Sequence, residues 1–198
     1  QQTTDGGYII VGTWLIKTDS NGNVEWINES ISGTSGQQTT DGGYIIIGNG
    51  ELIKTDSNGN EQWINESNGS QVQQTTDGGY VILGSTSIVK LDSNGEWEWD
   101  TWADPGVGCG FLCNNSQAIQ QTSDDGYIQI YTDYHNPMNN WGHYDVFLTK
   151  RDSQGQVEWY YNLGSPLYYD YGYSVDQTED DGYIITGVAN YYNSDGES

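Results

Sequence analysis

The chain has 198 residues, and its 28 acidic and 5 basic side chains give a formal net charge of −23 at pH 7. Because Lys and Arg neutralise phosphate groups, this balance argues against nucleic-acid binding and against attachment to an anionic membrane surface. No run of the sequence approaches the roughly 18 apolar residues of a membrane span, so we expect no membrane insertion.

The chain is built on one repeated phrase. The letters QQTTDGGY occupy residues 1–8 and return unchanged at 37–44 and 73–80, with looser copies at 120–127 and 176–183. A second phrase, of the type LIKTDSNGNVEW, follows each of the first four copies, within 14–26, 51–63, 87–99 and 146–159. The tyrosines that end the first phrase are 36, 36, 47 and 56 residues apart, and a period of this size predicts a repeat architecture.

Each repeat predicts four short antiparallel strands, in the order QQT, YIIVG, LIKTD and NVEW. The apolar runs have the length of strands and are rich in Ile, Val, Tyr and Trp. The DGG and SNG segments are turn sequences, since Gly and Asn tolerate the positive φ of tight hairpin turns. Runs such as YIII are apolar on both faces, which is typical of strands sandwiched between neighbouring sheets. Four-stranded units repeated radially form a β-propeller, and a β-solenoid is the main alternative.

The expected units are 1–33, 34–69, 70–102, 114–162 and 173–198, which together make a single all-β domain of about four and a half blades. The fifth unit contains only its first hairpin. The first unit already has all four of its strands, so it has no spare strand with which to complete the fifth. We therefore expect the sequence to be part of a longer protein.

The two phrases together resemble known repeats. QQTTDGGYIIVG followed by LIKTDSNGNVEW is similar to the tandem β-propeller repeats of secreted and cell-surface proteins of bacteria and archaea, over almost the whole chain. The resemblance implies a propeller at an extracellular or cell-surface location, but little about activity, because propellers host many unrelated functions. The spacing of Asp19, Gly22 and Trp26 differs from that of the Asp-box of sialidase-type propellers, so we expect no sialidase chemistry.

The Asp-Gly-Gly segment of the first phrase is expected to hold the shape of a turn. Gly6, Gly42 and Gly78 are expected to have positive φ. The aspartates of the five copies are expected to cap these turns by accepting backbone N–H bonds: Asp5, Asp41, Asp77, Asp125 and Asp181.

Four of the five basic residues occupy one position of the second phrase: Lys17, Lys54, Lys90 and Lys150. Residues two apart in a strand share a face, so Lys17 is placed on the same face as Asp19. We therefore expect one structural salt bridge, or one packing contact of the aliphatic stem, in each repeat.

Three long insertions fall on the face opposite the DGG and SNG turns, at 103–117, 132–145 and 163–173. Variable loops on a rigid scaffold are where binding sites usually lie. The candidate binding residues are aromatic side chains in and beside these segments: Trp102, Tyr134, Trp141, Tyr144, Tyr168, Tyr169 and Tyr171. Among carboxylates and amides, such rings suit a glycan or a protein partner. The alternative is that they pack the loops onto the scaffold.

Two segments are candidate metal sites. If DYHNPMNNWGHYD folds as a hairpin, Asp133 faces Asp145 and His135 faces His143, and this set could hold Zn²⁺ or a similar ion. The alternative is a hairpin of polar cross-strand pairs. In the SNG turn, the oxygen-bearing side chains Asp19, Asn21 and Asn23 alternate as in part of a calcium loop, although turn chemistry also explains them.

The remaining motifs concern covalent modification. Cys109 and Cys113 are expected to form a short-range disulfide of an exported protein. Four Asn-x-Ser sequons suggest surface glycosylation: Asn28, Asn65, Asn68 and Asn114.

The acidic residues mostly follow the repeat, and no nucleophile–base pair or phosphate loop is apparent. The leading hypothesis is a non-catalytic extracellular propeller that acts in adhesion, surface display or assembly of a fibre or coat, with possible self-assembly. It would bind a protein or glycan through the insertion loops. The alternative is a lectin-like or glycan-active propeller. No cofactor is expected beyond a possible Ca²⁺ or Zn²⁺ ion.

Overall fold

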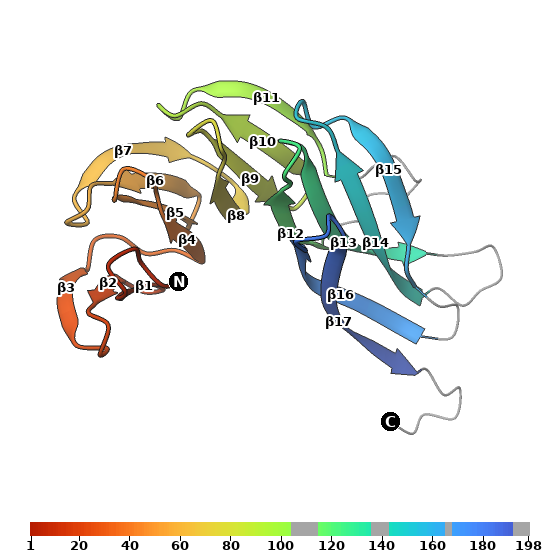
Figure 1. Ribbon diagram of the computed structural model, residues 1–198, viewed down its shortest axis with the longest axis horizontal. Coiled ribbons are helices and arrows are strands. Elements are labelled where there is room, and N and C mark those ends of the chain that lie inside the picture. The colour runs from red at the N-terminus through yellow and green to blue at the C-terminus, as the bar shows by residue number, and fades with distance from the viewer. Residues whose placement is uncertain (104–114, 136–142, 165–167, 192–198) are drawn as a thin grey trace. The chain divides into compact units, whose positions relative to one another are not determined.

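The computed structural model describes residues 1–103, 115–135, 143–164 and 168–191. The regular secondary structure within these ranges consists of β-strands alone (Figure 1). These ranges contain no helix with the length and apolar character needed to cross a membrane. The all-β prediction is therefore confirmed for the described residues.

Neighbouring strands pair in chain order, so each repeat forms its own sheet. The first sheet contains β1 (Tyr8–Val11), β2 (Leu15–Thr18) and β3 (Val24–Asn28), with an isolated bridge between Gln2 and Tyr8. The second contains β4 (Ser35–Gln38), β5 (Tyr44–Gly48), β6 (Glu51–Thr55) and β7 (Glu61–Glu66). The third contains β8 (Gly69–Gln74), β9 (Tyr80–Gly84), β10 (Ser87–Leu91) and β11 (Trp97–Trp102).

The last two sheets are longer. The fourth contains β12 (Asn115–Gln121), β13 (Tyr127–His135), β14 (His143–Arg151) and β15 (Val157–Asn162), and the fifth contains β16 (Tyr168–Gln177) and β17 (Tyr183–Tyr191). The predicted start of the fifth unit at residue 173 is wrong, because β16 already pairs with β17 from Tyr168 onward. Half of the expected 163–173 loop is therefore strand.

The chain divides into two compact units. The first comprises Gln1–Gly84 and Val89–Trp99, and the second comprises Ser85–Ile88 and Asp100–Ser198. The first unit thus holds the first two sheets and most of the third, and the second holds the fourth and fifth sheets.

The Asp-Gly-Gly turns have the predicted backbone. Gly6, Gly42 and Gly78 have φ of 84°, 84° and 85°. The side chain of Asp41 accepts a hydrogen bond from the backbone N–H of Gly43 at 3.0 Å, and Asp5 and Asp77 cap their turns in the same way.

The prediction for the last two repeats is wrong by one residue. Asp124 and Asp180 accept the capping N–H bonds, from Gly126 and Gly182. Asp125 and Asp181 instead occupy the position of the first glycine, both with φ of 62°. Aspartate can take this position because its short polar side chain tolerates the left-handed region better than most residues do.

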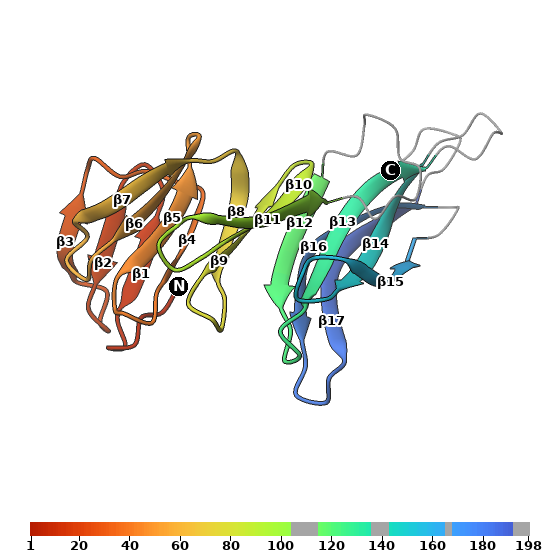
Figure 2. The same ribbon diagram turned by 90° about the horizontal axis from the view of Figure 1, so that it is seen from above.

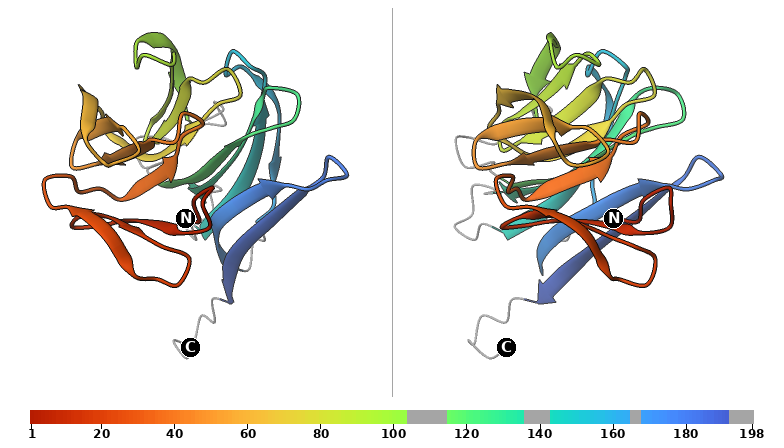
Figure 3. Two further views of the ribbon diagram at one scale, coloured as in Figure 1. Left: turned by 60° about the vertical axis from the view of Figure 1, so that its left-hand side comes forward. Right: turned by 90° about the vertical axis from the view of Figure 1, so that its left-hand side faces the viewer.

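Strand β5 is buried on both faces, as its uninterrupted apolar run predicts. Tyr44 and Ile46 pack against a cluster that includes Ile9 of β1. On the other face of the strand, Ile45 belongs to a cluster that includes Val72 of β8. The first unit is therefore a stack of sheets packed face to face (Figure 3).

The first repeat shows how much burial a preceding sheet provides. Ile46 is 0% exposed, whereas Ile10, its counterpart in β1, is 50% exposed. Full burial of one such side chain is worth about 1.5–3 kcal/mol. Contact between sheets therefore contributes most of the apolar burial on this face of each repeat.

In the second unit, β16 lies beside β12, β13 and β14 (Figure 2). Ile128, Ile130 and Val146 form a core with Val175 of β16. Gly172 allows the close approach of the two sheets, because a Cβ at this position would lie 2.5 Å from the Cδ1 atom of Ile130.

Neighbouring sheets are joined by contacts that recur from repeat to repeat. The ring of Trp26 meets that of Tyr44 edge-on at 5.7 Å, and Trp63 meets Tyr80 at 5.9 Å. The side-chain amide of Asn28 donates to the carbonyl oxygen of Gly59 at 2.8 Å in the next SNG turn.

The QQT segments add a reciprocal pair of hydrogen bonds between sheets. The backbone N–H of Thr4 donates to Oε1 of Gln38 at 2.7 Å, and the backbone N–H of Gln38 donates to Oε1 of Gln1 at 2.9 Å. The repeated phrase therefore both closes a turn and fastens one sheet to the next.

Candidate functional site

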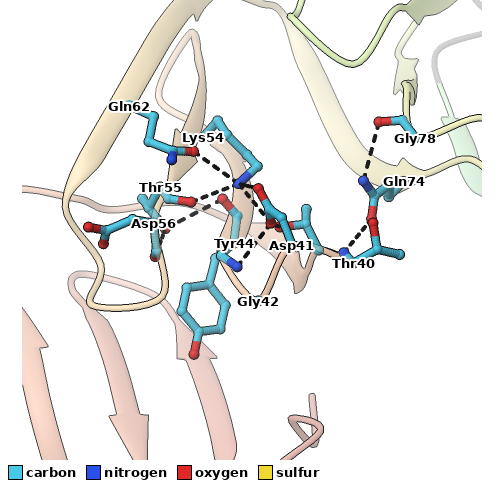
Figure 4. Close-up of polar contacts among 12 residues, drawn as sticks. Thr40, Asp41, Gly42, Tyr44, Lys54, Thr55, Asp56, Gln62, Gln74 and Gly78 are labelled. Atoms are coloured by element: carbon cyan, nitrogen blue, oxygen red, sulfur yellow. Dashed lines mark hydrogen bonds and ion pairs between the residues drawn. The ribbon is translucent and has the colours of Figure 1, made fainter.

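A buried lysine lies at the centre of each complete repeat. In the second repeat, Nζ of Lys54 on β6 contacts Oδ2 of Asp41 at 2.8 Å, the carbonyl oxygen of Thr55 at 2.8 Å and Oε1 of Gln62 at 3.2 Å (Figure 4). The lysine is only 3% exposed. We call these four residues the Lys54 cluster.

The predicted structural salt bridge is present, but the expected partner was wrong. Lys17 pairs with Asp5 and Glu25, both at 2.8 Å, and not with Asp19. Asp19 instead closes the SNG turn, because its Oδ1 accepts the backbone N–H groups of Asn21 and Asn23. The lysine is held by carboxylates from the DGG turn and the last strand, which sequence spacing alone does not place near it.

The lysine and its carboxylate are both charged. Burial raises the pKa of Asp41, but the hydrogen bonds from Lys54, Thr39 and Gly43 have a larger effect in the opposite direction. The pKa is therefore lowered to about 2. In the first repeat, burial lowers the pKa of Lys17, but hydrogen bonds from Asp5 and Glu25 outweigh this effect and raise the pKa above its ordinary value. These clusters are therefore ion pairs at neutral pH.

The second repeat differs from the others at one position of this cluster. Glutamates form the second ion pair with the other three lysines: Glu25, Glu98 and Glu158. The corresponding residue in β7 is Gln62, so Lys54 and Asp41 balance each other and the Lys54 cluster has no net charge.

A pocket of about 400 Å³ opens beside the Lys54 cluster, between residues of the second and third sheets within the first unit. Its lining includes Gln62 and Trp63 of β7, Tyr80 of β9 and Asn94 of the third SNG turn. Gln74 closes one side, where its side chain bridges Thr40 and Gly78 (Figure 4). We call this cavity the Gln62 pocket.

The insertion-bearing end of the second unit contains a tyrosine cluster. Tyr144 of β14 lies 5.4 Å from the ring of Tyr171 and 6.0 Å from that of Tyr169, both on β16. Burial raises the pKa of Tyr171, and the neighbouring tyrosines add to this effect. Three of the predicted binding residues are thus brought together.

The other predicted aromatic residues are not part of this cluster in the described chain. Trp102, at the end of β11, is 73% exposed. Trp141 lies outside the described residues, as do the side chains of Tyr134 and Tyr168.

The predicted hairpin at 132–145 has the expected register. Asp133 pairs with Asp145 and His135 pairs with His143 across β13 and β14. Asp145 is buried, and its Oδ2 accepts a hydrogen bond from Asn162 at 2.8 Å. The side chains of Asp133, His135 and His143 lie outside the described part, and the remaining residues contain no group of three acidic, His or Cys side chains suited to a metal.

In the SNG turn, the carboxylate of Asp19, one of the proposed calcium ligands, stabilises the turn itself. Both carboxylate oxygens of Asp19 accept hydrogen bonds, and the side-chain amide of Asn23 donates one of them. The turn is therefore complete without an ion.

The modification candidates are only partly covered by the described residues. Cys109, Cys113 and Asn114 lie outside them. Asn65 donates its side-chain amide to the carbonyl oxygen of Gly95 at 2.8 Å, as Asn28 does to Gly59. Asn68 is exposed, which makes it the described sequon best placed for a glycan.

Arg151 is a structural anchor that the repeat pattern does not predict. It is 1% exposed, and it donates to Oε1 of Gln129, to the carbonyl oxygen of Gly155 and to those of Trp102 and Ala103, where the 103–117 insertion begins. Gln129 stands where the other complete repeats have isoleucine, and Arg151 stands where they have threonine or leucine. Two simultaneous departures on one face of the sheet, on the neighbouring strands β13 and β14, were the available sign of a contact.

No protein-family model matches the chain, and no curated protein matches it. A crystal structure of a protein of unknown function from Bacteroides caccae is similar, with 13% sequence identity and a TM-score of 0.42, over 81% of this chain and 79% of that one. We therefore argue function from the residues of this chain alone.

Proposed function

We propose that the chain is a non-catalytic extracellular β-propeller that binds a protein or glycan partner through the insertion-bearing end of its sheets, in adhesion, surface display or assembly of a fibre or coat. The sheets are antiparallel, have up to four strands each, and pack face to face through side-chain contacts that recur from repeat to repeat. This arrangement supports a propeller over a β-solenoid. The large acidic excess suits a soluble exported scaffold.

The tyrosine cluster is the observation that carries the binding proposal. Strands β13 and β14 have nine residues each, against five in β5 and β6, so the insertion extends the sheet beyond the repeat. This extension carries Tyr144, which contacts Tyr169 and Tyr171. Rigid aromatic rings on extended strands supply contact area with little loss of conformational entropy on binding.

A binding role is also supported by how the polar residues of the repeat are used. The buried lysines are neutralised by carboxylates, and the aspartates of the DGG and SNG turns accept backbone N–H bonds. These contacts give the groups a structural role in holding the scaffold.

The test uses labelled full chain on a glycan array and on surfaces coated with fibronectin or collagen. We expect saturable binding to at least one surface, lost in the double variant Tyr144→Ala/Tyr171→Ala. Tyr160→Ala is the matched control, because Tyr160 is an exposed tyrosine of the same unit on β15. Absence of binding on every surface, or equal binding by the double variant, would contradict the proposal.

A glycan-binding role is the second candidate. It is favoured because the rings of Tyr144, Tyr169 and Tyr171 lie together and each ring carries a hydroxyl group. Glycan recognition combines aromatic surfaces with such polar groups. Binding confined to the glycan array would favour this candidate over protein adhesion.

A further inference from the structure

The Gln62 pocket lies beside the DGG and SNG turns of the second and third sheets. All residues of the first unit are described, and the pocket is formed within that unit. Its volume of about 400 Å³ is in the range of sites for small molecules. The contact between the second and third sheets therefore leaves an open space beside the Lys54 cluster.

Tyr80, which lines this pocket, has a hydroxyl group without a protein partner. Its side chain is 1% exposed and its ring contacts Trp63 at 5.9 Å, yet its hydroxyl forms no hydrogen bond with any residue of the first unit. Burial, together with the charge of Asp41, raises the pKa of Tyr80 to about 12, so the hydroxyl keeps its proton at neutral pH. The hydroxyl oxygen is not among the buried polar atoms that lack a partner, so solvent reaches it and it can donate to water or to a ligand in the pocket.

Gln62 and Asn94 add further unused groups. Gln62 uses its Oε1 to accept from Lys54, so its amide N–H groups are left without a protein acceptor in this unit. Asn94 uses its amide nitrogen on Asp92, so its Oδ1 is left without a donor. The pocket thus offers two donors and one acceptor beside the ring of Trp63.

The charge of the pocket selects the class of ligand. Lys54 and Asp41 neutralise each other, and Gln62 replaces the glutamate that would make the cluster negative. No unbalanced charge remains to attract an ion, and the net charge of −23 opposes anions in particular. Mixed donors and acceptors beside an aromatic surface instead match a molecule with several hydroxyl groups on an apolar ring.

We infer that the Gln62 pocket binds a neutral polyhydroxy compound, in the simplest case one sugar residue of a glycan. The hydroxyl of Tyr80 and the amide of Gln62 donate to ligand oxygens, Oδ1 of Asn94 accepts a ligand hydroxyl, and Trp63 contacts the C–H face of the ring. This site is independent of the tyrosine cluster and of the function proposed for it.

The test is a titration of ¹⁵N-labelled full chain with the methyl glycosides of glucose, galactose, mannose and N-acetylglucosamine. The reporter is the indole N–H resonance of Trp63, identified by its loss in Trp63→Phe. We expect a saturating shift with at least one glycoside. Affinity should fall about three- to tenfold in Tyr80→Phe, which removes one hydrogen bond and keeps the ring.

The decisive variant is Gln62→Glu, which installs the residue found at this position in the other three complete repeats. It should fold normally and lose at least about tenfold in affinity, because it removes a donor and leaves the cluster negative. Glu25→Gln, the reverse change in the first repeat, should bind as the unaltered chain does.

Two results would overturn the inference: no saturating shift with any of the four glycosides, or equal affinity in Gln62→Glu. The variants of the tyrosine cluster should titrate normally in this assay. The failure of either proposal is therefore visible separately from that of the other.

Discussion

The two glycines of the second Asp-Gly-Gly turn, Gly42 and Gly43, are required for different physical reasons, and this difference can be measured. Gly42 has φ of 84°, and a Cβ on it would meet nothing closer than Ser57 at 4.0 Å. A Cβ on Gly43 would lie 2.1 Å from the carbonyl oxygen of Thr55 and 2.6 Å from Nζ of Lys54. We therefore compare Gly42→Ala with Gly43→Ala.

The expected costs follow from these contacts. Gly42→Ala adds only the strain of a non-glycine residue in the left-handed region, about 1–2 kcal/mol. Gly43→Ala must move β5 away from β6 by about an ångström and displace Lys54 from Asp41. Overpacking of this kind costs about 1–3 kcal/mol, and loss of a charged hydrogen bond adds about 1.5–3 kcal/mol, so we expect about 2.5–6 kcal/mol in total.

Urea unfolding of the full chain, followed by tryptophan fluorescence, measures both costs. Gly42→Asp is the matched control, because Asp125 and Asp181 occupy the same turn position with φ of 62° in the last two repeats. It should cost less than Gly42→Ala. If Gly43→Ala were as stable as Gly42→Ala, the proposed steric role of the second glycine would be wrong.

Two further predictions concern buried charges. The pKa of Asp41 is about 2 in the folded chain against an ordinary value of 3.8, so its stabilising contribution is complete above pH 3.8 and is lost as the pH falls toward 2. The urea midpoint should fall over this window, and less steeply in Asp41→Asn; an equal slope would contradict the ion-pair role. Arg151→Leu introduces the residue that Leu91 supplies in the third repeat, and should lower the free energy of unfolding by at least about 3 kcal/mol, because Gln129 and three carbonyl groups lose their donor. A loss below about 1 kcal/mol in the same urea assay would show that water replaces the guanidinium.

The sheets and turns could be predicted because their causes are local. An apolar run such as residues 44–47 predicts a strand buried on both faces, and Gly42 predicts the turn that precedes it. The pairing of His135 with His143 followed from the symmetry of the hairpin sequence. Each of these features depends on residues close together in the chain.

The partners of the buried lysines could not be predicted because they depend on contacts between strands distant in sequence. Lys17 is two residues from Asp19, but its ion pairs are with Asp5 in the DGG turn and with Glu25 on β3. The assignment of Asp125 as a cap failed for a different reason. An ungapped alignment of QQTSDDGY with QQTTDGGY puts Asp124 in the position of the capping aspartate and Asp125 in that of the first glycine, and the hydrogen bond to Asp124 and the φ of Asp125 agree with this alignment.

The repeat makes each departure from it informative, because the other copies act as internal controls. Gln62 replaces a glutamate that three other clusters retain, and this single change leaves a neutral cluster beside the pocket where a second ion pair would otherwise form. Gln129 and Arg151 depart together, and they bond to each other and to the start of an insertion. The repeated phrase has a uniform structural role: it closes turns and joins sheets. Selectivity therefore has to come from positions where one copy differs, which is why the decisive variants restore the repeat at Gln62 or remove the tyrosines that the insertions add.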